Sequence, residues 1–145
     1  MIAALLLGRK GSVGFPGKNM TKVLGQPLAW YPMNAALSSG TIDVGYLSTD
    51  DPELMDLARA TGFKVIERPD YLCTSEALGE DAYKHGFDVI CQELGQKPEL
   101  LVLLFCNAPT VSPAQINEGI KAMREDPKLD SAITVSRYNM YSPLR

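Results

Sequence analysis

The amino-acid sequence predicts a single α/β domain with a mainly parallel sheet. Its 145 residues are 46% hydrophobic and 21% charged, which is ordinary for a globular domain with one buried core. Short apolar runs alternate with helix-like stretches, and no repeat or linker interrupts them. This alternation is typical of parallel strands joined by right-handed helical crossovers. The predicted strands are Ile2–Leu7, Val44–Ser48, Phe63–Glu67, Leu100–Cys106 and Ser131–Ser136.

Helices are predicted between these strands from their end signals. An aspartate before Pro52 can cap a helix, Pro52 suits the first turn, and Gly62 stops it. The run Ser112-Pro-Ala-Gln115 is typical of a capping box that opens a helix ending near Arg124. The continuous apolar run at Leu100–Cys106 predicts a strand covered on both faces. The two remaining predicted helices are Pro27–Ser39 and Leu78–Leu94.

Four loops follow the carboxyl ends of the predicted strands. Each is rich in glycine, proline or polar residues. In open parallel sheets ligands bind beyond this edge, so we expect the four loops to converge on one cleft. The loops are Gly8–Asn19, Thr49–Asp51, Arg68–Ala77 and Asn107–Val111.

The first loop carries the residues expected of an anion site. Gly11, Gly14 and Gly17 allow positive φ angles and a close approach of the backbone to a ligand. Arg9 and Lys18 bracket them and can neutralise a polyphosphate. The spacing is neither that of a Walker A motif nor that of a dinucleotide-binding fingerprint. From these residues alone, an anion cradle and an ordinary solvated loop are both open.

The composition narrows the classes of partner and the cellular setting. A net charge of −3 and a pI near 5.1 argue against a dedicated nucleic-acid binder. The apolar run Ile2–Leu7 is too short to span a membrane. Cys73, Cys91 and Cys106 lie far apart and form no metal-ligand spacing with His85. Free thiols suit a reducing cytoplasm, where we expect the protein to act.

Longer strings of residues resemble one enzyme family. The first loop, Gly8-Arg-Lys-Gly-Ser-Val-Gly-Phe-Pro-Gly-Lys-Asn19, resembles the N-terminal signature of the sugar-activating cytidylyltransferases. Those enzymes make CMP-sialic acid and CMP-activated relatives such as CMP-3-deoxy-manno-octulosonate. The resemblance covers essentially the whole chain in the same order. It continues in Leu24-Gly-Gln-Pro-Leu28, Ser48-Thr-Asp-Asp51, Glu67-Arg-Pro69, Leu103-Leu104 and Ala108-Pro109.

The resemblance implies a fold, a reaction and partners. The fold is a three-layer αβα, Rossmann-like nucleotide-diphospho-sugar transferase fold. The reaction transfers CMP from CTP to a sugar acid and releases pyrophosphate, with Mg²⁺ as cofactor and a homodimer as the assembly. The family's paired metal-binding aspartates belong to a C-terminal part that we expect to lie outside this chain. Residues 1–145 are therefore expected to be a nucleotidyltransferase domain that is incomplete at its C-terminus, and no metal ligand is assigned within them.

Individual site residues follow from the family's motifs. Arg9 and Lys18 would stabilise the pyrophosphate leaving group and so act catalytically. Asn107 would contact the sugar. One of Asp50 and Asp51 is expected to cap the following helix, and Asp50 also has the option of lining the nucleotide cleft. The residues expected to bind the nucleotide are Leu7, Arg9, Lys10, Gly11, Ser12, Lys18, Asn19, Arg68 and Ala77.

Two departures from the family pattern leave questions open. The family has a lysine at the position of Val13, whereas this chain has Lys10, which either reaches the phosphates or faces solvent. Phe105 stands where the family has a glutamine that helps to recognise the acyl sugar, and a phenylalanine supplies no amide hydrogen bonds. One option is that Phe105 is a buried strand residue and Asn107 faces the cleft. The acceptor is therefore sialic acid, another nonulosonate or a different sugar acid. Another sugar nucleotidyltransferase and a non-catalytic nucleotide- or sugar-binding module are the alternatives.

Overall fold

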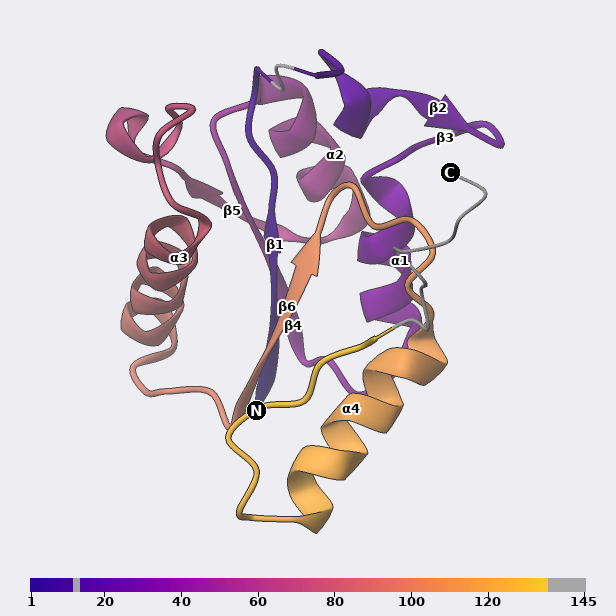
Figure 1. Ribbon diagram of the computed structural model, residues 1–145, viewed down its shortest axis with the longest axis vertical. Coiled ribbons are helices and arrows are strands. Elements are labelled where there is room, and N and C mark those ends of the chain that lie inside the picture. The colour runs from indigo at the N-terminus through magenta and orange to yellow at the C-terminus, as the bar shows by residue number, and fades with distance from the viewer. Residues whose placement is uncertain (12–13, 136–145) are drawn as a thin grey trace, which may run out of the picture.

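A four-stranded parallel sheet forms the centre of the computed structural model, which describes residues 1–11 and 14–135 (Figure 1). The strand order is β5-β4-β1-β6. All three neighbouring pairs run parallel, as the alternating pattern predicts. The strands are β1 (Ile2–Leu7), β4 (Val44–Thr49), β5 (Lys64–Glu67) and β6 (Leu100–Phe105).

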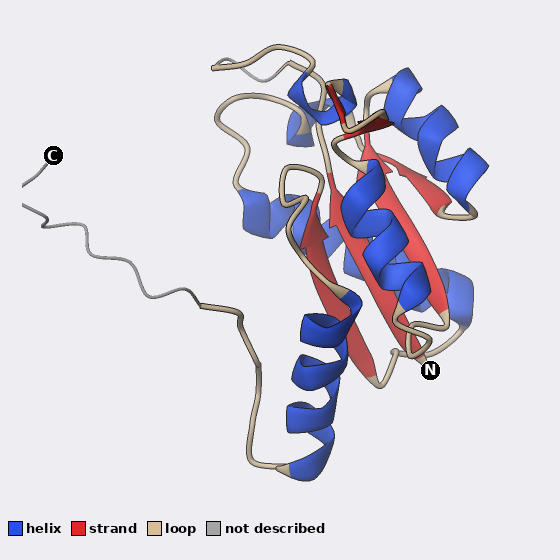
Figure 2. Ribbon diagram, turned by 90° about the vertical axis from the view of Figure 1, so that its right-hand side faces the viewer, coloured by secondary structure: helices blue, strands red, loops and turns tan. Residues whose placement is uncertain are grey.

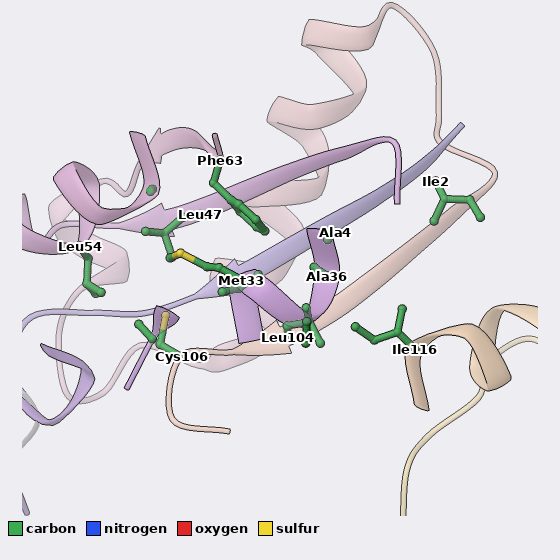
Figure 3. Packing of buried hydrophobic residues seen from close by; sticks show 14 of the residues in the cluster. Ile2, Ala4, Met33, Ala36, Leu47, Leu54, Phe63, Leu104, Cys106 and Ile116 are labelled. Atoms are coloured by element: carbon green, nitrogen blue, oxygen red, sulfur yellow. The ribbon is translucent and has the colours of Figure 1, made fainter. Parts of the chain in front are cut away.

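Helices cover both faces of the sheet and make three layers (Figure 2). Helices α1 (Trp30–Ser38), α2 (Pro52–Thr61) and α4 (Pro113–Glu125) pack on one face. Of the described helices, α3 (Gly79–Leu94) is the one that packs on the other face. Figure 3 shows the larger core, to which Met33 contributes from α1. The predicted three-layer αβα architecture is confirmed.

Strand β1 is apolar throughout because its two faces enter different cores. Its even-numbered residues belong to the cluster beneath α1, α2 and α4, and its odd-numbered residues to the cluster beneath α3. Successive side chains of a strand point to opposite faces, so a central strand needs apolar residues at every position. Burying each leucine contributes about 1.5–3 kcal/mol. The five residues Ile2, Ala3, Ala4, Leu5 and Leu6 are at most 1% exposed.

The predicted helix signals are confirmed by local contacts. Asp51 caps α2 by accepting a hydrogen bond from the Glu53 amide at 3.0 Å. Gly62 ends that helix with a φ of 87°, in the left-handed region that favours glycine. Ser112 and Gln115 form the reciprocal capping box that opens α4.

The first predicted helix begins later than expected. Residues 26–27 belong to β3 (Gln26–Pro27), which pairs with β2 (Lys22–Val23) in a small antiparallel hairpin, so α1 starts only at Trp30. Two short 3₁₀ turns, Lys18–Met20 and Asp70–Leu72, lie in segments predicted as loops. No helix in residues 1–11 and 14–135 is long and apolar enough to cross a membrane.

Two predictions about the C-terminal strands are wrong. Strand β6 contacts helices on both faces but is not fully buried, because it lies at the edge of the described sheet: four of its six residues are partly exposed and Phe105 is exposed. Ser131–Ser136 was expected to be a strand, but residues 131–135 have no regular secondary structure and are exposed; Ser136 lies outside the described residues. An apolar, β-branched segment becomes a strand only when it pairs with a neighbour, and no described strand pairs with residues 131–135.

Candidate functional site

A cavity of about 480 Å³ opens at the carboxyl edge of the sheet. This volume lies within the range of small-molecule sites, which is roughly 300–1,000 Å³. Its walls come from the loops after β1, β5 and β6 and from the start of α3. A second cavity of about 450 Å³ lies beside the first loop and reaches Asp51 and the start of α2. The predicted loops therefore converge, but around two cavities that share the first loop.

The structure brings the predicted site residues to these two cavities. Arg9, Lys18 and Asn19 line both of them. Ser12 lies outside the described residues. The first cavity also contains Leu7, Arg68, Ala77 and Asn107, and the second also contains Lys10 and Gly11.

Arg68 is held at the end of β4 by Ser48. Its Nη2 donates to the Ser48 carbonyl oxygen at 2.7 Å, and its Nε donates to the Ser48 hydroxyl at 3.2 Å. The side chain is buried, and this burial lowers the pKa of Arg68 from its usual value. An arginine remains charged despite such a shift, so Arg68 presents a fixed positive charge at the cavity wall.

Arg9 ties the first loop to the loop that precedes α3. Its Nη1 donates to the carbonyl oxygens of Cys73, at 3.2 Å, and Thr74, at 2.9 Å. The Thr74 hydroxyl in turn accepts a hydrogen bond from the Ala77 amide at 3.1 Å. These contacts place Ala77 against the cavity that Arg9 also lines.

The two adjacent aspartates have different roles. Asp51 caps α2, whereas Asp50 accepts a 2.7 Å hydrogen bond from the Lys10 backbone amide. Asp50 therefore anchors the first loop to the end of β4. Sequence reasoning left this division open, because only the three-dimensional structure shows that the Lys10 amide lies beside Asp50. The Lys10 residue is exposed and borders the second cavity.

The glycines of the first loop serve two purposes. Gly11 and Gly17 have φ angles of 80° and 69°, as the prediction of left-handed backbone requires. Gly14 is not among the glycines with positive φ. Gly8, which the sequence did not single out, permits a close approach instead. A Cβ atom there would lie only 2.7 Å from the Cys106 sulfur.

Asn19 is the one buried, incompletely paired side chain among the predicted nucleotide contacts in the described part of the chain. Its Oδ1 atom accepts no hydrogen bond from the described residues. An unpaired buried amide oxygen typically costs about 1–3 kcal/mol. Because Asn19 lines both cavities, a ligand donor is a natural partner for this atom.

Phe105 does not lie in the core, which corrects one expectation for this residue. It is half-exposed and lines the first cavity together with Asn107. Two further apolar side chains that the sequence did not single out, Phe15 and Leu78, are exposed on the same cavity. The available signals were the position of Phe15 in the first loop and that of Leu78 directly after the predicted loop Arg68–Ala77. The described residues contain no group of three or more His, Cys, Asp and Glu side chains that could hold a metal ion.

Comparison with known families assigns the chain. The family described as Cytidylyltransferase matches residues 3–137, and this span includes both cavities. This chain belongs to the cytidylyltransferase family.

Two curated relatives show how much of a longer enzyme this cytidylyltransferase chain corresponds to. It is 27% identical over 143 residues to an N-acylneuraminate cytidylyltransferase of Escherichia coli O18:K1:H7 (strain RS218 / NMEC), covering 99% of this chain and 33% of that protein. It is 33% identical over 121 residues to N-acylneuraminate cytidylyltransferase B of Danio rerio, covering 82% of this chain and 27% of that protein. The chain thus spans about a third or less of the length of these relatives.

Solved structures support the fold of this cytidylyltransferase. A CMP:2-keto-3-deoxy-manno-octonic acid synthetase complexed with CTP aligns with a TM-score of 0.69 and 24% identity, covering 88% of this chain and 49% of that one. A Mycobacterium tuberculosis H37Rv protein in complex with manganese aligns with a TM-score of 0.51 and 17% identity, covering 83% and 58%. At these identities the likeness is evidence for the fold alone, and the predicted nucleotide-diphospho-sugar transferase fold is confirmed.

Proposed function

We propose that this chain carries the CTP-binding part of an enzyme that transfers CMP from CTP to a sugar acid. The main evidence for this proposal is the cavity at the carboxyl edge of the sheet, which is lined by Arg9, Lys18, Arg68 and the buried Asn19. Three cations around one cavity suit a polyphosphate, and Asn19 offers an unpaired amide oxygen to a donor on the rest of the nucleotide. The names of both curated relatives support an acylated sugar acid as the acceptor.

In the proposed reaction, an acceptor hydroxyl oxygen attacks the α-phosphorus of CTP. A new oxygen–phosphorus bond forms, the bond from the α-phosphorus to the β-phosphate oxygen breaks, and pyrophosphate leaves in line. The hydroxyl proton passes to solvent. Arg9 and Lys18 stabilise the charge that builds up on the leaving pyrophosphate, while Arg68 and Asn19 hold the nucleotide.

A divalent ion, proposed to be Mg²⁺, accompanies the CTP phosphates because hard oxygen ligands suit it. The described residues form no carboxylate cluster that fits such an ion, so no step of the reaction is assigned to it here. Phe105, which stands where the family resemblance has a sugar-contacting glutamine, favours a second candidate function in which this chain binds the nucleotide without turning it over. The homodimer implied by the family resemblance stays a proposal that sedimentation of the purified chain tests.

Calorimetric titration with CTP, UTP, ATP and GTP, each with and without Mg²⁺, tests the nucleotide half of the proposal. Of the four nucleotides, we expect only CTP to bind with micromolar affinity or better. Equal affinity for all four nucleotides would argue for a different nucleotidyltransferase or an unspecific anion site. Pyrophosphate release from CTP in the presence of an acylated sugar acid separates an active enzyme from a binding module.

A further inference from the structure

The first cavity is divided into a cationic part and an apolar part. Arg9, Lys18 and Arg68 supply the charge. The apolar part includes Phe15, Leu78 and Phe105, which are 57%, 62% and 49% exposed. Large apolar side chains gathered on one concave surface are typical of a ligand contact. The triphosphate accounts for the cationic part, and the rest of the proposed nucleotide is assigned to Asn19 and Ala77. The apolar side chains are then left for the acceptor.

The strand geometry places Phe105 on the face of the sheet that α3 covers. Leu104 faces the core beneath α1, α2 and α4, whereas Leu101 and Leu103 contact the core beneath α3. Side chains alternate along a strand, so Phe105 shares the face of Leu103 and continues that apolar face to the end of the sheet. Leu78 is the N-cap residue of α3 and lines the same cavity. Figure 1 shows the end of β6 and the start of α3 at the same edge of the sheet.

The chemistry of this wall restricts the group that can lie against it. A phenylalanine ring and a leucine side chain neither donate nor accept hydrogen bonds. A sugar hydroxyl pressed against them would lose its bonds to water without replacement, whereas a methyl or methylene group gains from leaving water. Asn107 lines the same cavity and offers an amide that can pair with a carbonyl oxygen. An acyl group has both features, an apolar end and a carbonyl.

We propose that Phe105 is a specificity-determining residue that selects acceptor sugar acids by the apolar end of their acyl group. This inference rests on the proposed function, because it concerns the acceptor of that same reaction. Its signature is discrimination between acyl groups that differ only at their far end. A methyl is favoured over a hydroxymethyl, since the added hydroxyl meets the Phe105 ring.

The test compares the N-acetyl, N-propanoyl and N-glycolyl forms of neuraminic acid, titrated into the chain with saturating CTP. We expect the N-acetyl and N-propanoyl forms to bind about tenfold tighter than the N-glycolyl form, the usual scale of discrimination by a hydrophobic pocket. Phe105→Gln should bring the three forms within about threefold of one another, because a glutamine can pair with the added hydroxyl, while Phe105→Leu should keep the wild-type order.

Leu37→Gln is the matched control. Leu37 is 47% exposed, close to the exposure of Phe105, but it lies on α1 and lines neither cavity. This variant should keep both the wild-type order and the CTP affinity. Thermal unfolding of each variant shows that the fold is retained.

The outcomes separate the two proposals. Normal CTP binding with equal affinity for the three acids, with no acid bound, or with unchanged discrimination in Phe105→Gln overturns the role of Phe105 and leaves the nucleotide proposal standing. Failure of the wild-type chain to bind CTP overturns the proposed function, and the inference about Phe105 fails with it.

Discussion

Replacing Gly8 by alanine tests how the first loop is joined to the sheet. The added Cβ atom would lie 2.7 Å from the Cys106 sulfur and 3.0 Å from Cδ1 of Leu54. Non-bonded carbon contacts are normally about 3.5–4.0 Å, so the neighbours must move by about 1 Å. Both neighbours are fully buried and cannot turn into solvent. Overpacking of this kind costs about 1–3 kcal/mol, and we expect Gly8→Ala to lose that much stability.

The measurement is urea or thermal unfolding followed by circular dichroism. For a chain of this length, about 1–3 kcal/mol corresponds to a fall in Tm of roughly 2–12 °C. Gly14→Ala is the matched control, because a Cβ atom there meets nothing within 4 Å and its φ is not positive. That variant should stay within about 0.5 kcal/mol of the wild type.

A double mutant shows whether the clash is with the Cys106 sulfur. Cys106→Ala removes that sulfur, so combining it with Gly8→Ala should cost less than the sum of the two single changes. The interaction free energy should be about 0.5–3 kcal/mol. A Gly8→Ala variant that is as stable as Gly14→Ala would refute this reasoning. Stability losses of Gly8→Ala and Cys106→Ala that simply add would also refute it, because a Cβ atom at position 8 then does not clash with the Cys106 sulfur.

Three further predictions concern charge, reactivity and capping. Arg9→Ala and Lys18→Ala should each weaken CTP binding roughly tenfold to a hundredfold in calorimetry. Lys22→Ala, which lies outside both cavities, should leave the CTP affinity unchanged. Equal effects of all three variants would contradict specific phosphate contacts by Arg9 and Lys18. Burial raises the pKa of the Cys106 thiol to about 12. In the folded protein it should therefore resist iodoacetamide at pH 8 while the two partly exposed cysteines react, as mass spectrometry will show. Because this pKa is raised on folding, its stabilising contribution is present below about pH 9 and is lost as the pH rises toward 12. Asp51→Ala should lose about 1 kcal/mol in urea unfolding through the missing N-cap, and an unchanged midpoint would contradict the capping role.

Local signals made most of the fold predictable. The N-cap at Asp51, the stop at Gly62 and the capping box at Ser112 each depend on residues within a few positions of one another. The apolar run Ile2–Leu7 predicted a strand, and both faces of β1 are covered. The apolar run Leu100–Cys106 predicted burial on both faces, but the burial of β6 depends on its neighbours in the sheet and not on the run itself.

The candidate site was predictable in its residues but not in their relations. Motifs alone identified Arg9, Lys18 and Arg68, and the structure places all three around one cavity. The separate roles of Asp50 and Asp51 depend on where the Lys10 amide lies, and no sequence pattern carries that information. The exposure of Phe105 likewise depends on the strand order at the edge of the described sheet.

The hydrogen bonds of Arg9 join the first loop to the loop before α3 and still leave donors for an anion. Its two hydrogen bonds to the carbonyls of Cys73 and Thr74 use two of the five donors of a guanidinium group. Three donors remain in a fixed plane, so phosphate binding does not require the loops to separate. Arg68 is similarly fixed by Ser48, and its pKa is lowered chiefly by burial and slightly by Arg9. An anion placed between these two cations would offset their Coulomb repulsion, which is the arrangement that the proposed binding of a polyphosphate requires.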